Sequence, residues 1–110
     1  MLKVAVASSD GKVVNQHFGR TKQFLIFQVE EGIYRFLELR TTSPACRGQN
    51  HNEGKMEEMI ETISDCKAVL VSQIGAGATD KLLAKGIEAF IIPIFIDDAL
   101  KAWMEMEGLA

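Results

Sequence analysis

Three side chains able to hold a metal lie in two polar stretches of this 110-residue sequence. His17 belongs to the stretch 8–21, whereas Cys46 and His51 belong to the stretch 41–52. One thiolate and two imidazoles suit zinc, iron or an iron–sulfur cluster, because sulfur and imidazole nitrogen both bind these metals. The C-x4-H spacing is not that of a standard zinc finger. The pattern alone therefore leaves open that both histidines are solvated and the cysteine is incidental.

Gly75 and Gly77 form a second candidate feature, between an expected strand and an expected helix. Exposed backbone N–H groups and the positive end of a helix attract anions at such a position. The dinucleotide fingerprint requires a third glycine where this chain has Asp80, and the Walker pattern is absent. The pair indicates close approach of the backbone to an anionic ligand, although a tight strand-to-helix turn explains it equally well.

Basic residues flank the same stretches and could offset the negative charge of a metal cluster. A solvated charged rim accounts for any one of them taken alone; the four are Lys12, Arg20, Lys22 and Arg47. The whole chain has 15 acidic and 12 basic residues, for a formal net charge of -3. This balance argues against a general nucleic-acid binder, which usually presents a basic face to phosphates.

Hydrophobic periodicity and glycine punctuation predict the elements that must position these residues. Strands are expected at 2–7, 24–29, 33–40, 68–71 and 87–92, and the break 30–32 predicts a hairpin. The stripe 56, 59, 60, 63 predicts an amphipathic helix. Two further helices are expected after 75 and 97, with Asn52 and Asp97 as caps. Cys66 is expected to be structural.

The resulting order is βββαβαβα, an α/β fold with one domain over residues 1–110. Strand–helix–strand alternation implies parallel pairing, so we expect a ribonuclease-H-like mixed five-stranded sheet with helices on both faces. Only the second strand should run backwards. This topology brings the stretches 8–21, 41–52 and 73–77 to one edge, outside the carboxyl ends of the parallel strands, where ligands bind in open α/β sheets. Cys66 should lie at the other end.

The N-terminal sequence has no charged leader region or cleavage site, so we expect no signal peptide. The longest apolar run, 89–96, contains Pro93 and is far shorter than the roughly 20 residues that span a bilayer. We therefore expect a cytoplasmic protein without membrane contact, in which free thiols are buried, metal-bound or reactive.

Several segments together resemble a known family. They are Val4-Ala-Val-Ala-Ser-Ser-Asp-Gly-Lys, His17-Phe18-Gly19-Arg20, the loop that contains Cys46, and Val71-Ser-Gln-Ile-Gly-Ala-Gly-Ala. The combination resembles the dinitrogenase iron-molybdenum cofactor biosynthesis family, over essentially the whole chain. The resemblance implies a small stand-alone ribonuclease-H-like domain that binds iron–molybdenum cofactor or its iron–sulfur precursor, as a carrier or chaperone in nitrogen fixation rather than an enzyme. A cluster-assembly or acceptor protein is the implied partner.

The resemblance also implies which residues face the cluster. Metal ligands would be His17, Cys46 and His51, and further contacts to the cofactor would come from Phe18, Gly19, Arg20, Arg47, Gly75 and Gly77.

Two other functions stay open on the sequence. A metal-dependent nuclease would need several carboxylates clustered across the sheet to hold Mg²⁺, yet only Asp10 is expected near the carboxyl end of the first strand. The second alternative is a metal-free regulatory or scaffolding module that binds a protein partner or a small anion.

Overall fold

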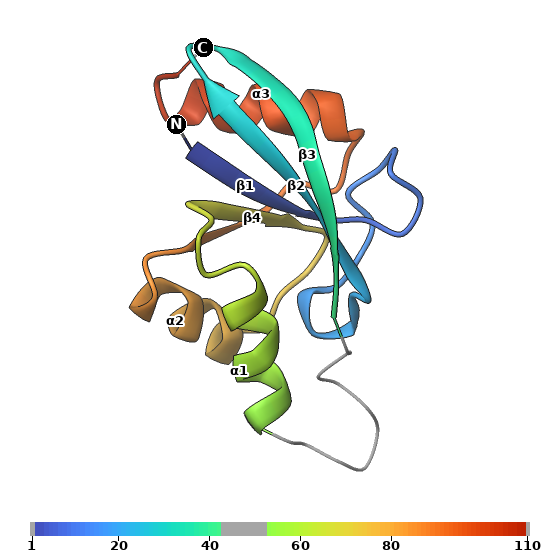
Figure 1. Ribbon diagram of the computed structural model, residues 1–110, viewed down its shortest axis with the longest axis vertical. Helices are drawn as coiled ribbons and strands as arrows, with labels where there is room; N and C mark the ends of the chain where they lie inside the picture. The colour runs from blue at the N-terminus through green and yellow to red at the C-terminus, as the bar shows by residue number, and fades with distance from the viewer. Residues whose placement is uncertain (1, 43–52, 110) are drawn as a thin grey trace.

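The computed structural model describes residues 2–42 and 53–109. Its elements are, in chain order, β1 (Leu2–Ala7), a 3-10 turn (Phe18–Arg20), β2 (Gln23–Glu30), β3 (Ile33–Thr41), α1 (Glu53–Thr62), β4 (Ala68–Val71), α2 (Ala76–Ala84), β5 (Glu88–Ile91) and α3 (Ile96–Met106). Figure 1 shows α3 on one side of the sheet and α1 and α2 on the other. The predicted order βββαβαβα is observed.

The five strands form one mixed sheet in the order β3-β2-β1-β4-β5. β1 pairs antiparallel with β2 and parallel with β4, β2 pairs antiparallel with β3, and β4 pairs parallel with β5. Only β2 therefore runs against the rest, as expected from the sequence. The carboxyl ends of β1 and β4 lie next to each other, because Val6 is paired with Leu70 near the end of each strand.

Alternating side chains of the central strands divide the core into two layers, as the period of two in a strand requires. On the face with α1 and α2, Ala5, Ile26 and Val69 pack with Ile63, which directly follows α1, and with Leu82 of α2. On the other face, α3 packs against the strand side chains that point away from α1 and α2. That second layer comprises Val4, Val6, Leu70, Ala99, Leu100 and Trp103, all of them fully buried. The helical stripe predicted at 56–63 faces the first layer.

The structure corrects two details of the expected elements. Asp97 does not cap α3: the N-cap is Phe95, and Asp97 and Asp98 lie in the first helical turn. Carboxylates are favourable there because the N-terminal end of a helix carries partial positive charge. Strand β5 is also shorter than the predicted 87–92. The predicted cap Asn52 lies outside the described residues.

No helix in the described ranges is both long enough and apolar enough to cross a membrane.

Candidate functional site

The long β1–β2 connection folds back between the ends of β1 and β4 and is fixed there by main-chain hydrogen bonds. The N–H of Gln16 donates to the carbonyl of Ala7 at 3.3 Å, and the N–H of Ser72 donates to the carbonyl of Gln16 at 3.0 Å. The N–H of Phe18 donates to the carbonyl of Gln73 at 2.9 Å, and His17 and Gln73 form a parallel bridge. We call the segments 15–20 and 72–78 the rim.

The earlier part of the same connection is fixed to the segment before α3. The N–H of Val14 donates to the carbonyl of Ile94 at 2.9 Å, and the N–H of Ile96 donates to the carbonyl of Lys12 at 2.8 Å. Within the loop, an Asp10 carboxylate oxygen accepts from the N–H of Lys12 and of Val13 at 2.9 and 3.1 Å. These bonds lower the pKa of Asp10. The carboxylate considered for a nuclease is thus part of the loop's own structure.

His17 is held by its side chain as well as by its backbone. Its Nδ1 accepts a hydrogen bond from the N–H of Gly19 at 3.0 Å, so that His17 is the N-cap of the 3-10 turn Phe18–Arg20. The N–H of Arg20 donates to the carbonyl of His17 at 3.0 Å. A polar side chain that satisfies an otherwise unpaired N–H is the usual function of an N-cap. The imidazole therefore has a fixed orientation on the rim.

The three residues after His17 occupy different environments. Phe18 is fully buried and its ring lies 5.8 Å from that of Phe24, so it anchors the rim in the core below. Gly19 is buried, whereas Arg20 is exposed. Contact of Phe18 and Gly19 with a ligand stays a prediction; in this structure the phenyl ring packs against the α1 and α2 side of the sheet.

Gly75 and Gly77 lie at the start of α2, a few residues after Gln73, the residue bridged to His17. Gly75 is the N-cap of α2 and has ordinary extended angles, φ -82° and ψ 156°. Among residues 2–42 and 53–109, a Cβ added at either glycine would meet nothing within 4 Å. Neither glycine is therefore required by a left-handed backbone or by tight packing, and the open space above both leaves the backbone accessible.

The other predicted ligand residues, Cys46, His51 and Arg47, lie outside the described residues. The end of β3 does reach this edge, because the N–H of Thr42 donates to the carbonyl of Lys22 at 2.8 Å. Among residues 2–42 and 53–109, no group of three or more His, Cys, Asp or Glu side chains could hold a metal ion. Any metal bond to Cys46 or His51 thus stays a prediction.

A charged cluster joins Lys3 and Asp65, near the starts of β1 and β4, to Glu38 and Arg40, near the end of β3. Arg40 donates to both carboxylate oxygens of Asp65: Nη1 donates to Oδ1, and Nη2 donates to Oδ2 at 3.0 Å. The Nε of Arg40 donates to Glu38 Oε2 at 2.7 Å. Arg40 Nη1 also donates to the carbonyl of Thr62 at 2.9 Å, which satisfies the end of α1. Hydrogen bonds from Arg40, then from Lys3, hold the pKa of Asp65 well below its usual range.

Cys66 follows this cluster and is buried, with an exposed fraction of 4%. Burial, then the neighbouring Asp65 carboxylate, raises the pKa of the Cys66 thiol to about 12. A protonated, buried thiol is a poor nucleophile and a poor metal ligand. This environment agrees with the structural role expected for Cys66.

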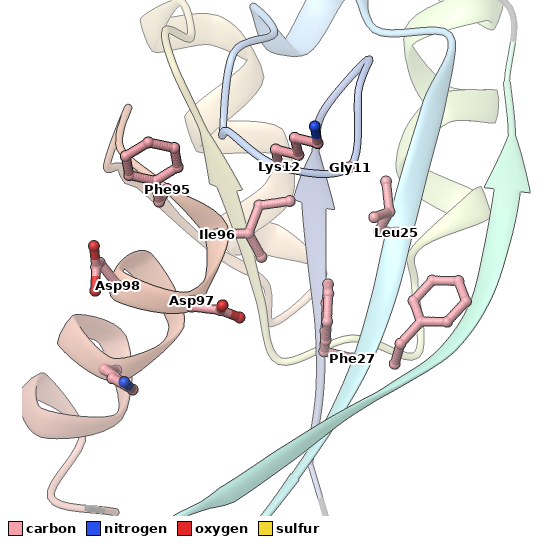
Figure 2. A pocket seen from close by; sticks show the side chains of 10 residues that line it. Gly11, Lys12, Leu25, Phe27, Phe95, Ile96, Asp97 and Asp98 are labelled. Atoms are coloured by element: carbon pink, nitrogen blue, oxygen red, sulfur yellow. The ribbon is translucent and has the colours of Figure 1, made fainter.

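A groove of about 720 Å³ lies between the β2–β3 pair and the start of α3 (Figure 2). Leu25 and Phe27 lie on its strand side, and Ile96 and Phe95 on its helix side. Phe36 and Phe95 are 53% and 63% exposed. Its charged lining residues are Lys12, Asp97, Asp98 and Lys101. The groove shares the β1–β2 connection with the rim, since Lys12 belongs to that connection.

Sequence reasoning did not single out Gln16 and Gln73, whose carbonyl groups hold the rim together. Both act through the main chain, so their side-chain type carries no signal. The only indication of their role was position: Gln73 follows β4, and Gln16 lies in the connection after β1.

A comparison with family models matches residues 1–106 to the family described as dinitrogenase iron-molybdenum cofactor. The FeMo cofactor biosynthesis protein NifB of Frankia alni is 39% identical over 100 residues, which cover 88% of this chain and 20% of that protein. Protein NifX of Azotobacter vinelandii is 35% identical over 115 residues, covering 99% of this chain and 65% of NifX. The chain therefore spans about a fifth of the length of the NifB relative.

Among solved structures, the fold is similar to that of PH0822, with a TM-score of 0.72 and 25% sequence identity. The match covers 96% of this chain and 90% of PH0822. The family match over residues 1–106 and the structural match over 96% of the chain both extend over most of its length.

Proposed function

The chain belongs to the dinitrogenase iron-molybdenum cofactor family, and on that premise we propose that it binds and carries an iron–sulfur or iron–molybdenum-type cluster, or its precursor, during cofactor biosynthesis. The observation that carries this proposal is the rim. Two segments more than fifty residues apart in sequence, one with His17 and one with the open glycine pair, are joined there by main-chain hydrogen bonds. The cluster is cargo rather than a resident cofactor of a reaction.

The rim supports this proposal through the groups it can offer, and we propose that the segment after β3, which is not part of the rim, adds the following metal ligands. Cys46 would supply a thiolate and His51 an imidazole nitrogen, both from the segment that follows β3. The backbone at Gly75 and Gly77 would approach cluster sulfides, since the first N–H groups of a helix lack partners within it. Arg20, which is exposed beside His17, and Arg47 would offset the negative charge of the cargo. A carrier of this kind needs no catalytic group, and we place it in the cytoplasm. We propose that the architecture is ribonuclease-H-like, and the sheet order β3-β2-β1-β4-β5 supports this.

The experiment is anaerobic incubation of the protein with iron and sulfide, followed by absorption spectroscopy and by iron and sulfide analysis. We expect a visible absorption band that is lost in a Cys46→Ala, His17→Ala double variant. Cys66→Ala is the matched control, because that thiol is buried and precedes β4, whereas the rim segment follows the other end of that strand. The absence of a band in the wild type, or a band unchanged in the double variant, would overturn the proposal.

A carrier must also meet a cluster-assembly or acceptor protein, and we propose that this partner docks in the groove beside the rim. Support comes from the exposed Phe36 and Phe95 and from the β1–β2 connection, which lines the groove through Lys12 and continues to His17. Partner docking next to the rim would shorten the path of transfer. The same groove also favours the alternative function, a metal-free scaffolding or regulatory module that binds a partner protein in the groove without carrying a cluster.

Charge substitution in the groove separates these two functions. Phe36→Glu and Phe95→Glu should leave cluster uptake intact and slow transfer to an apo-acceptor protein. Ile33→Glu is the control, because Ile33 is 71% exposed and does not line the groove. If the groove variants abolish partner binding while the wild type binds the same partner equally well with and without cluster, the scaffolding function is correct.

A further inference from the structure

The orientation of the His17 ring is set before any ligand arrives. Its Nδ1 accepts from the N–H of Gly19 at 3.0 Å. The residues on either side are paired with the β4–α2 turn through the Gln16 carbonyl and the Phe18 N–H. Phe18 itself is fully buried. Backbone and ring are therefore fixed together. The hydrogen bond at Nδ1 then determines whether Nε2 carries a proton.

A ring nitrogen that accepts a hydrogen bond carries a lone pair and no proton. In the neutral imidazole the single proton is then on Nε2. Within the described chain, no protein group accepts a hydrogen bond from this Nε2. The capped ring is thus an N–H donor on its second nitrogen, not a lone-pair donor.

Metal coordination conflicts with this arrangement in either mode. A metal on Nε2 moves the proton of the neutral ring to Nδ1, where it would face the N–H of Gly19 across 3.0 Å. A metal on Nδ1 would take the lone pair that Gly19 already uses. Each mode requires the cap to break and the 3-10 turn to lose its N-terminal partner. Donation from Nε2 requires no change.

The neighbouring groups on the rim have the same character. The N-cap of α2 is Gly75, which has no side chain to accept hydrogen bonds from the first N–H groups of the helix. No atom of the part of the chain that the structure describes would lie within 4 Å of a Cβ at Gly75 or Gly77. In an α-helix these first N–H groups have no intrahelical acceptor. His17 and the start of α2 together present donors, and donors pair with acceptor atoms.

From this geometry, and resting on the carrier function proposed above, we propose that His17 binds the cargo as an Nε2–H donor to an acceptor atom, a cluster sulfide or a carboxylate oxygen, and makes no metal bond. The rim would then recognise the anionic surface of the cargo. Any bonds to iron would come from residues outside the rim. His17 is accordingly a binding residue whose proton, not its lone pair, contacts the ligand.

The first test uses the cargo-free protein and needs no cluster. Long-range nitrogen–proton NMR spectra of protein labelled with ¹⁵N-histidine distinguish the two tautomers of the imidazole. A His51→Gln variant assigns the signals, since the chain has 2 histidines. We expect an unprotonated Nδ1 and a protonated Nε2 at His17. A protonated Nδ1 would overturn the proposal.

The second test compares His17→Gln with His17→Asn after anaerobic loading with iron and sulfide. The glutamine amide can donate near the former Nε2 position but is a poor iron ligand, whereas asparagine can keep the cap and has no group at Nε2. We expect Gln to retain cluster affinity within about threefold and Asn to weaken it about tenfold, the size of a hydrogen bond to an anionic acceptor. Cooperative unfolding of both variants shows that they keep the fold, and Gln should have the lower midpoint because it loses the cap.

Pulsed electron paramagnetic resonance of the reduced cluster supplies a direct readout. We expect the nitrogen couplings of the wild type to persist in His17→Gln. Loss of a strong nitrogen coupling in that variant would contradict the proposal and assign His17 as an iron ligand. If neither the wild type nor any His17 variant takes up iron and sulfide, the proposed carrier function is wrong, and so is the proposed contact between His17 and a cluster. The tautomer spectrum still decides the state of the free ring.

Discussion

The rim and the charged cluster are built in opposite ways. The rim is held by main-chain bonds, through the carbonyls of Gln16 and Gln73, so few of its side chains are used to hold it. The cluster is held by side chains: Arg40 and Asp65 satisfy each other in a two-pronged ion pair, and Lys3 adds a third bond at 3.0 Å. Charges that neutralise one another stabilise the fold, whereas polar groups left unpaired are available to a ligand. Substitutions in the cluster should therefore affect stability, and those on the rim should affect binding.

The largest effect is expected where the rim enters the core. Phe18→Ala removes a fully buried ring that packs against Phe24, and should lower the free energy of unfolding by about 3–5 kcal/mol. Phe18→Leu, which keeps most of the volume, should cost about 1.5 kcal/mol or less. Urea denaturation followed by circular dichroism measures both. A loss below about 1 kcal/mol for the alanine variant would show that the rim does not depend on this anchor.

Within the charged cluster, Asp65→Asn should lower the free energy of unfolding by about 1–2 kcal/mol and leave cluster uptake unchanged. The estimate is modest because the Asp65 side chain is 45% exposed and solvent screens the pair. The folded state lowers the pKa of this carboxyl. Its contribution should thus be complete above the unfolded pKa of about 3.9. It should shrink as the pH falls below that value. Denaturation at pH 7 and at pH 3 checks this, and an equal gap between wild type and variant at both would contradict it.

On the rim, Gly77→Ala should separate stability from binding. The added methyl group meets open space in a helical position, so the free energy of unfolding should rise by up to about 1 kcal/mol. Cluster affinity should fall, because the methyl group fills the space through which a ligand approaches the backbone. Thermal unfolding and cluster titration on the same preparation measure both. Unchanged affinity would remove Gly77 from the site.

The smallest effect is expected for chemical modification of Cys66 in the folded protein. Burial raises the pKa of this thiol to about 12, so it should remain protonated and unmodified by iodoacetamide at about pH 8, near the pKa of an ordinary thiol. In a Cys46→Ala variant, mass spectrometry should detect alkylation only after denaturation. Rapid labelling of the folded variant would show that the interior near Asp65 opens.

Much of the fold could be predicted from the sequence because local patterns determine it. The apolar runs 2–7 and 68–71 coincide with β1 and β4, and the glycine break at 30–32 correctly indicated a hairpin. The extra residue in β3 between the partners of Ile26 and Phe27 could not be predicted, since no glycine or proline marks it. Asp97 was misassigned because a carboxylate in the first turn has the same sequence signal as a cap.

The edge that gathers His17 and Gly75 followed from topology alone. The structure confirms that their two segments meet. The cluster of Arg40 and Asp65 was missed, since its partners are 25 residues apart and no spacing rule connects them. The cap between His17 and Gly19 is local, but the sequence pattern does not distinguish a histidine that caps a turn from one that binds a metal.

The central claim is that the rim, and neither the charged cluster nor the groove, receives the cargo. Line broadening of backbone amide signals by a bound paramagnetic cluster tests this most directly. After anaerobic loading with iron and sulfide, the amides of Gly19, Gln73 and Gly77 should lose intensity first, while those of Lys3 and Asp65 should keep theirs. Broadening centred on Asp65, or on Phe95 in the groove, would contradict the account.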